Sequence, residues 1–172
     1  GFYAPAQIVR DARDHQIEVR PICVNTSAWD NLLERRADGA LALRLGFRQI
    51  KGFKKEDADW IEAARGNGYQ DPESVWLRAG LAPSVLERLA EADAFTGVGL
   101  TRRDALWQVK AIRAPKPLPL FNDPIDGECI FEPRVSLPAM HLGEEVVEDD
   151  VAMRLTLRAH PMELLRPSLP GL

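Results

Sequence analysis

The chain has 172 residues, of which 45% are hydrophobic and 28% are charged, and its formal net charge is −4. This composition is that of a globular protein and excludes a disordered tail, while the length supports one ordinary domain or two small ones. No apolar run approaches the roughly 18 residues of a membrane span, so we expect no membrane partner.

Charge is distributed unevenly along the chain. Residues 1–115 carry 17 Lys and Arg against 16 Asp and Glu, whereas residues 116–172 carry 5 against 10. A nucleic-acid contact is therefore expected in the first two thirds, and it has to be local because no broad basic face is available. The chain opens without a signal-peptide pattern and without an initiator Met, so we interpret it as an internal or processed piece of a cytoplasmic protein.

The potential metal ligands are scattered. Neither cysteine and none of the histidines has a second ligand at a metal-binding spacing; these residues are Cys23, Cys129, His15, His141 and His160. We therefore expect two free cysteines in a reducing compartment and no metal site.

The expected elements follow in chain order. "APAQIVRDARDHQ" predicts a helix with Pro5 in its first turn, "IEVRPICV" a short edge strand, and "ALALRL" (40–45) a second strand. A mostly helical block is expected from about Phe47 to Ile112. The five prolines of "RAPKPLPLFNDPIDGECIFEP" indicate a linker or extended segment. "EEVVEDDVAMRLTLRAH" predicts a helix that ends near His160 and has a solvated acidic face, and "PMELLRP" one or two further turns. The fold class is mainly α with a few short strands.

The stretch "IKGFKKEDADWIEAAR" (50–65) places a glycine and two lysines immediately before a helix. If the helix begins near Lys55, the peptide N–H groups before it have no intrahelical acceptor, and the helix dipole favours an anion there. Gly52 allows a phosphate to approach the backbone closely, Lys51 and Lys54 add positive charge, and Phe53 turns into the core. The alternative interpretation is a glycine turn between helices with a solvated lysine cluster.

A similar arrangement recurs in "VLERLAEADAFTGVGLTRRDALWQV" (85–109), where a glycine turn separates two helices. Thr101 and Asp104 resemble a capping box, which fixes the second helix start. Cations in the first turn oppose the helix dipole, and phosphate binding would explain them, although simple exposure would also permit them. The two hairpins together predict successive phosphate contacts at Lys51, Gly52, Phe53, Lys54 and Lys55, and at Gly97, Val98, Gly99, Arg102 and Arg103. We expect that Gly97→Pro with Arg102→Ala lowers duplex binding without unfolding the protein.

These motifs resemble a known family. "GFYAPAQIVRDARDHQIEVRPICVN", "LRLGFRQIKGF", "LERLAEADAF", "RRDALW" and "LRAHPMELLRP" are similar, in order and over essentially the whole chain, to the error-prone branch of the bacterial DNA polymerase III alpha-subunit (C) family. The resemblance implies the end of the fingers at 1–38, a tandem helix-hairpin-helix DNA-binding module at 39–112, a proline-rich linker at 113–138, and a helical segment leading towards an oligonucleotide-binding (OB) domain at 139–172.

The resemblance also implies a function. The parent chain is expected to be a DNA-directed DNA polymerase, a nucleotidyltransferase that uses Mg²⁺ in damage-induced mutagenesis and translesion synthesis. Its catalytic aspartates lie upstream, so this piece is expected to hold duplex DNA by its backbone, with no catalytic residue and no cofactor of its own. Expected partners are DNA, the rest of the polymerase chain, accessory mutagenesis proteins that include a catalytically inactive Y-family polymerase homologue, and, weakly, the sliding clamp.

Two features depart from the family pattern. Lys54 stands where the first hairpin would have its second glycine, and left-handed backbone there would be strained. "PLPLF" (117–121) resembles a sliding-clamp peptide through Leu118, Leu120 and Phe121, but Pro117 replaces the expected Gln and can pair with no buried polar group of the clamp. The segment is therefore either a clamp-peptide relic that still binds the clamp directly or a linker that docks on its own domain.

The sequence leaves two alternatives to DNA holding. A helix-hairpin-helix glycosylase would need a catalytic Asp or Lys after the hairpin; Asp71 could be placed there, but no nucleophilic lysine lies near it. The other alternative is a structural or protein-docking module of the same polymerase, in which the hairpins only pack helices and make no direct DNA contact.

Overall fold

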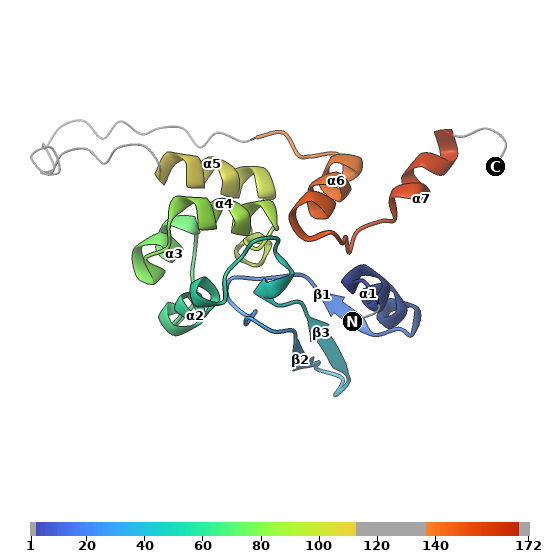
Figure 1. The fold of residues 1–172 in the computed structure, drawn as a ribbon, viewed down its shortest axis with the longest axis horizontal. Coiled ribbons are helices and arrows are strands. Elements are labelled where there is room, and N and C mark those ends of the chain that lie inside the picture. Colours follow the sequence, from blue (N-terminus) through green and yellow to red (C-terminus); the bar gives the residue numbers. More distant parts are fainter. Residues whose placement is uncertain (1–2, 113–136, 169–172) are drawn as a thin grey trace, which may run out of the picture.

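The computed structural model describes residues 3–112 and 137–168. Over these residues the protein is mainly helical with one small sheet (Figure 1), which confirms the expected fold class. The α-helices are α1 (Pro5–Asp14), α2 (Lys55–Ala64), α3 (Pro72–Ala79), α4 (Pro83–Glu91), α5 (Arg102–Ile112), α6 (Leu142–Met153) and α7 (Pro161–Leu165). Short 3₁₀ turns are η1 (Phe47–Gln49), η2 (Thr96–Val98) and η4 (Arg166–Ser168), and the strands are β1 (Glu18–Arg20), β2 (Leu32–Arg35) and β3 (Leu41–Arg44).

Proline sets the start of several helices. α1, α3, α4 and α7 each have Pro at the first helical positions, where its missing N–H costs nothing because that group has no intrahelical acceptor. α3 is also capped by Asp71, whose carboxylate accepts from the Ser74 N–H at 2.7 Å, and it ends at Gly80 with φ +67°. α2 and α5 begin without proline, with Lys55 and Arg102, and so they keep their first N–H groups.

The sheet has the order β1-β3-β2, with β1 parallel and β2 antiparallel to β3. β1 is an edge strand and β3 lies within 40–45, as the sequence predicts. β2 was not predicted, because Leu32 and Leu33 are exposed and give no alternating pattern. On one face the Glu34 carboxylate accepts from Arg44 Nε at 2.8 Å and from Arg20 Nη1 at 2.6 Å.

The helical block and the sheet share one apolar core. Phe47 and Phe53 stack with ring centroids 5.7 Å apart, and Ile61, Leu86 and Leu89 are fully buried beside them. The core therefore lies directly beneath the turn at 50–54, and Phe53 points inward as expected. None of the helices within the described ranges is long and apolar enough to cross a membrane.

The C-terminal part differs from expectation in one respect. The sequence predicts a helix that continues to His160, but α6 ends at Met153. Arg154 adopts the left-handed conformation with φ +57°, and its N–H closes the helix on the Asp150 carbonyl. A residue in this conformation cannot continue a right-handed helix, so residues 155–160 run as an irregular segment to α7. The four proposed domain ranges remain predictions.

Candidate nucleic-acid interface

The first hairpin consists of η1, the turn at 50–54 and α2. Gly52 takes the left-handed conformation with φ +70°, whereas Lys54 is extended (φ −104°, ψ 146°) and forms the N-cap of α2. The strain considered for Lys54 is therefore absent, because the turn places its left-handed residue two positions earlier. α2 begins at Lys55, as the sequence predicts.

The peptide N–H groups of this turn divide into two sets. Lys51 donates to the Ala152 carbonyl at 2.9 Å, and Phe53 donates to the Ile50 carbonyl at 3.1 Å. Within the described residues, the N–H groups of Gly52, Lys54 and the first three residues of α2 have no acceptor. Gly52 and Lys54 are also exposed residues, and a positive helix end with unpaired donors favours an anion.

The lysine side chains of the turn are exposed, and two of them are uncompensated. In the part of the chain that the structure describes, Lys51 and Lys54 have no ion-pair partner. Lys55 bonds Asp59 through Nζ at 2.8 Å, and this hydrogen bond raises the pKa of Lys55. Arg88, on α4, donates from Nη1 to the Gly52 carbonyl at 2.6 Å and so fixes the turn from the other side.

The second hairpin consists of α4, η2 and α5. Gly99 is left-handed with φ +83°. Val98 donates to the Phe95 carbonyl at 2.9 Å and Gly99 to the Thr96 carbonyl at 3.0 Å, so both N–H groups are bonded within the protein. Gly97 is exposed and its N–H has no acceptor among the described residues. This turn therefore presents fewer backbone donors than the first.

Gly97 has a packing reason to be glycine. An added Cβ would lie 2.5 Å from the Sγ of Cys23, far inside van der Waals contact. The segment around Cys23 is fastened to the same turn, since the Val24 N–H donates to the Ala94 carbonyl at 3.0 Å. Gly97→Pro would consequently disturb packing against Cys23 as well as any DNA contact. The expectation that the variant with Gly97→Pro and Arg102→Ala stays folded is therefore not supported.

The start of α5 is capped as the sequence predicts. The Asp104 N–H donates to Thr101 Oγ1 at 3.2 Å, and the Thr101 hydroxyl donates to the Asp104 carboxylate at 2.6 Å. The short Asp side chain reaches the hydroxyl and not the backbone N–H that Glu or Gln would reach in a capping box.

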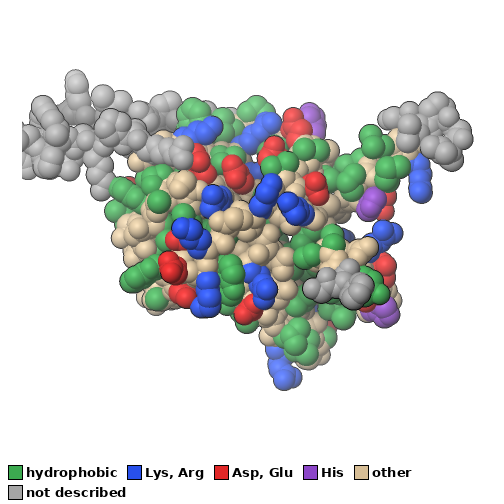
Figure 2. Space-filling view, viewed as in Figure 1, with side chains coloured by type: hydrophobic (Ala, Val, Ile, Leu, Met, Phe, Trp, Pro, Cys, Tyr) green, Lys and Arg blue, Asp and Glu red, His purple; other side chains and the backbone are tan. Residues whose placement is uncertain are grey.

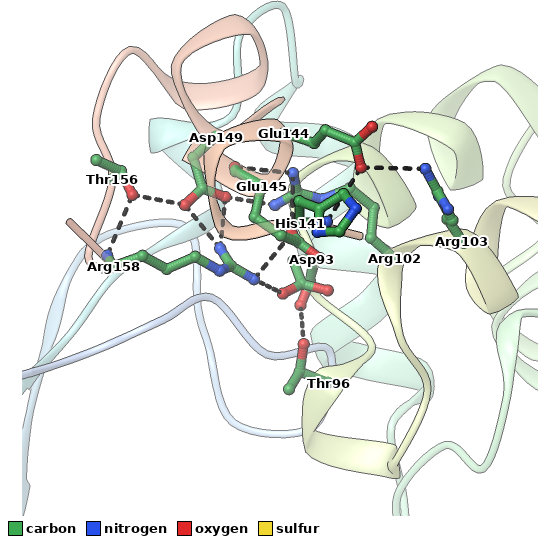
Figure 3. Close-up of polar contacts among 10 residues, drawn as sticks. All are labelled: Asp93, Thr96, Arg102, Arg103, His141, Glu144, Glu145, Asp149, Thr156 and Arg158. Carbon is green, nitrogen blue, oxygen red and sulfur yellow. Dashed lines mark hydrogen bonds and ion pairs between the residues drawn. The ribbon is translucent and has the colours of Figure 1, made fainter. Parts of the chain in front are cut away.

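Of the two arginines at this helix start, Arg102 is buried and Arg103 is partly exposed. Arg102 is 1% exposed, and its guanidinium bonds the Asp149 carboxylate of α6 (Figure 3). Arg103 donates to the Pro138 carbonyl at 2.9 Å and to Glu144 at 3.2 Å. The prediction that Arg102 contacts a phosphate is thus contradicted by its burial, and α6 supplies the negative charge that compensates both cations.

Asp149 is the centre of a buried ion cluster (Figure 3). It is 1% exposed and also accepts from Arg158 Nη1 at 2.7 Å and from the Thr156 hydroxyl at 2.8 Å. Glu145 lies 3.3 Å from Arg102 and 3.2 Å from Arg158. The acidic run of α6 is therefore not a purely solvated face, because Glu145 and Asp149 turn inward.

The cluster extends from α6 to the end of α4. Arg158 pairs with Asp93 at 2.5 Å. Burial lowers the pKa of Arg158, but hydrogen bonds and charges from Asp149 and Asp93 outweigh it, so the net shift is upward. Sequence reasoning missed this cluster because its members are separated by up to 65 residues, and no local pattern relates them.

The remaining expectations concern the surface and the linker. Lys and Arg side chains are mixed with Asp and Glu over the face drawn in Figure 2. This face therefore has no broad basic surface, and a DNA contact on it would have to be local. Leu118, Leu120, Phe121 and Cys129 lie outside the described residues. Within those ranges no three His, Cys, Asp or Glu side chains are grouped to hold a metal ion.

Two helix pairs joined by glycine turns, with unpaired N–H groups at a helix start, define the class of this protein. The family model of the helix-hairpin-helix motif matches residues 16–105, and the chain belongs to this family. Along its whole length it is 80% identical to a segment of an error-prone DNA polymerase of Ruegeria pomeroyi, of which it covers 16%.

Other relatives give the same result. Over 98% of the chain, 47% of residues are identical in an error-prone DNA polymerase of Mesorhizobium japonicum, of which 17% is covered. Over 96% of the chain, 45% are identical in error-prone DNA polymerase 1 of Rhizobium meliloti, again with 17% covered. These matches confirm the resemblance to the error-prone polymerases. The chain spans about a sixth of the length of the relatives it matches.

Proposed function

We propose that this chain is the segment of a bacterial error-prone DNA polymerase that holds duplex DNA by its backbone without reading sequence. The observation that carries the proposal is the first hairpin, where exposed N–H groups of Gly52, Lys54 and the α2 start lack acceptors within the described residues and two uncompensated lysines stand beside them. Such a site suits phosphate oxygens, which every base pair presents alike.

The lack of proline in α2 supports this proposal. Four other helices within the described ranges begin with Pro, which removes one terminal donor. α2 begins with Lys55 and keeps that donor, although proline is the commoner choice in this chain. A retained N–H at an exposed helix start can donate to water or to an anion outside the helix.

The activity of the whole enzyme belongs to the same proposal. The parent chain would be a cytoplasmic DNA-directed DNA polymerase acting in translesion synthesis with Mg²⁺, and it would work with accessory mutagenesis proteins. This segment would contribute no catalytic group and no metal ligand. Its role would be to hold the product duplex behind an active site formed elsewhere in the polypeptide.

A second function is favoured by a specific observation at the second hairpin. Arg102 and Arg103 are both engaged by α6, so this hairpin behaves as a protein-docking element. If the first hairpin also binds no DNA, the chain is a structural module of the polymerase.

Salt-dependent binding to a labelled duplex, followed by fluorescence anisotropy, separates the two functions. The native chain is expected to bind weakly and to give a log–log salt slope of about −2 to −4. Lys51→Ala with Lys54→Ala should make the slope shallower by about 1.8, since each phosphate contact contributes about 0.9.

The matched control is Arg10→Ala with Arg35→Ala. These arginines are exposed on α1 and β2, outside both hairpins, and have no ion-pair partner in the described ranges. The control removes the same two charges and should leave the slope nearly unchanged. Equal slopes for the two double variants would refute a specific contact at the first hairpin.

A further inference from the structure

α6 contacts both hairpins. Its carboxylates bind the start of α5 through Arg102 and Arg103, and its last turn accepts the Lys51 N–H of the first hairpin at the Ala152 carbonyl, 2.9 Å away. Residues 142–153 lie outside the 16–105 match of the helix-hairpin-helix family model. The helix is therefore an addition that spans the two halves of the tandem module.

The contact with the second hairpin is an anchor. Asp149 and Arg102 are each 1% exposed, and Val146, Ala152 and Leu155 are buried beside or just beyond the ion cluster. If α6 moved away, the Arg102 guanidinium would lose its Asp149 counter-ion and would have to be hydrated instead, because proteins strongly avoid a buried charge without a partner. The position of α6 is consequently fixed by the second hairpin.

The contact with the first hairpin has a different character. The Ala152 carbonyl belongs to the last turn of α6, where carbonyls have no intrahelical donor, so it is free to accept from Lys51. Lys51 precedes Gly52, whose carbonyl is held from the other side by Arg88. These two hydrogen bonds hold peptide units 50–51 and 52–53, which lie next to the units that carry the Gly52 and Lys54 N–H groups, and those two N–H groups have no acceptor among the described residues.

We propose that α6 is a brace, anchored on the second hairpin through Asp149, that holds the turn of the first hairpin in the geometry that receives a duplex. The two hairpins then have different partners: the first binds the phosphate backbone, and the second binds α6. Asp149 is a positioning residue that acts on DNA through Ala152 and Lys51. The inference rests on the proposed function for its DNA part only.

The direction in which one substitution changes the affinity for duplex DNA tests the brace. Removing an acidic charge near a DNA-binding surface ordinarily strengthens binding, because it reduces repulsion of the phosphates. Asp149→Asn should instead weaken duplex binding by about two- to thirtyfold, the range usual for residues that act through a packed element. Asp150→Asn is the control, since it removes the same charge from the next, exposed position of α6 and should leave affinity unchanged or slightly higher.

Amide hydrogen exchange, measured on the full chain without DNA, tests the same brace directly. In Asp149→Asn the Lys51 amide should exchange faster, while the Phe53 and Val24 amides, which bond Ile50 and Ala94, should keep their protection. Glu145→Gln, at a half-buried position facing Arg102, is a milder variant for the case that Asp149→Asn does not fold, and it should change both readouts in the same direction.

Each outcome decides part of the proposal. Selective exposure of Lys51 with weaker binding supports it. The proposal is overturned if Asp149→Asn binds the duplex as tightly as Asp150→Asn or more tightly. It is also overturned if the Lys51 amide of Asp149→Asn exchanges at the native rate, or if the Lys51, Phe53 and Val24 amides all lose protection equally. If the native chain binds no duplex, the proposed function and the DNA part fail together, and the exchange data alone decide whether α6 braces the turn.

Discussion

Gly97→Ala should destabilise the protein through a single steric conflict. The added Cβ would lie 2.5 Å from the Sγ of Cys23, and Cys23 is buried. Overpacking of this kind costs about 1–3 kcal/mol. For a chain of this size we expect a fall in Tm of about 2–4 °C for each kcal/mol.

Cys23→Ala should relieve the conflict. The Cβ of Cys23 is 3.7 Å from the position of the added carbon, an ordinary contact, so only the sulfur has to be removed. Cys23→Ala alone should cost about 1 kcal/mol, since it deletes one buried atom. The double variant should be no less stable than Cys23→Ala, which gives a coupling of about 1–3 kcal/mol.

The assay is urea unfolding of the four proteins at pH 7 with reductant, together with duplex binding at low salt. Additive destabilisation in the double-mutant cycle would show that the two side chains do not compete for space. If the double variant is stable but loses duplex binding relative to Cys23→Ala, then Gly97 is needed for phosphate approach and the packing explanation is insufficient.

Two further predictions concern α2 and the sheet. Lys55→Pro should fold as well as Lys55→Ala, because proline is accepted at a helix start after an extended residue. It should bind a duplex about tenfold more weakly than Lys55→Ala, because it lacks the N–H that would donate to a phosphate. Equal affinities of the two variants would contradict a backbone contact at this position. Glu34→Gln should lower the free energy of unfolding at pH 7, because the hydrogen bond from Arg44, and with it that from Arg20, lowers the pKa of Glu34. A carboxylate with a depressed folded-state pKa contributes its full stability above the unfolded-state pKa and loses it as pH falls through the folded-state pKa. In urea titrations the difference in unfolding free energy from the native chain should therefore begin to shrink near the ordinary Glu value of about 4.3 and vanish only below the lower folded-state pKa of Glu34; a difference that is independent of pH would contradict this cause.

The elements that local chemistry controls could be predicted from the sequence. Pro5 marks the start of α1, Lys55 starts α2 after its glycine turn, and Thr101 with Asp104 caps α5. In each case the signal lies within a few residues of the feature. The same holds for the inward orientation of Phe53, which follows from its place between exposed lysines.

Long-range partners were not accessible to such reasoning. The sequence left open whether phosphate binding or simple exposure explained the cations at the α5 start, and the compensating carboxylate of Asp149 is 47 residues away from Arg102. β2 was missed because its leucines are exposed at an edge of the sheet. The end of α6 was missed because Arg154 carries no glycine-like signal for its left-handed conformation.

The separation between Arg102 and Asp149 also sets an order of events during translation. Arg102 leaves the ribosome 47 residues before Asp149, an interval of about 2 to 9 s at about 5–20 residues per second. Until α6 emerges, the Arg102 guanidinium has no carboxylate to pair with, so it stays hydrated. The second hairpin then lacks the contact with α6 that covers it in the folded protein. A ribosome that stops after α5 would therefore release a chain with an arginine that cannot be buried, and such a chain would be a substrate for proteolysis.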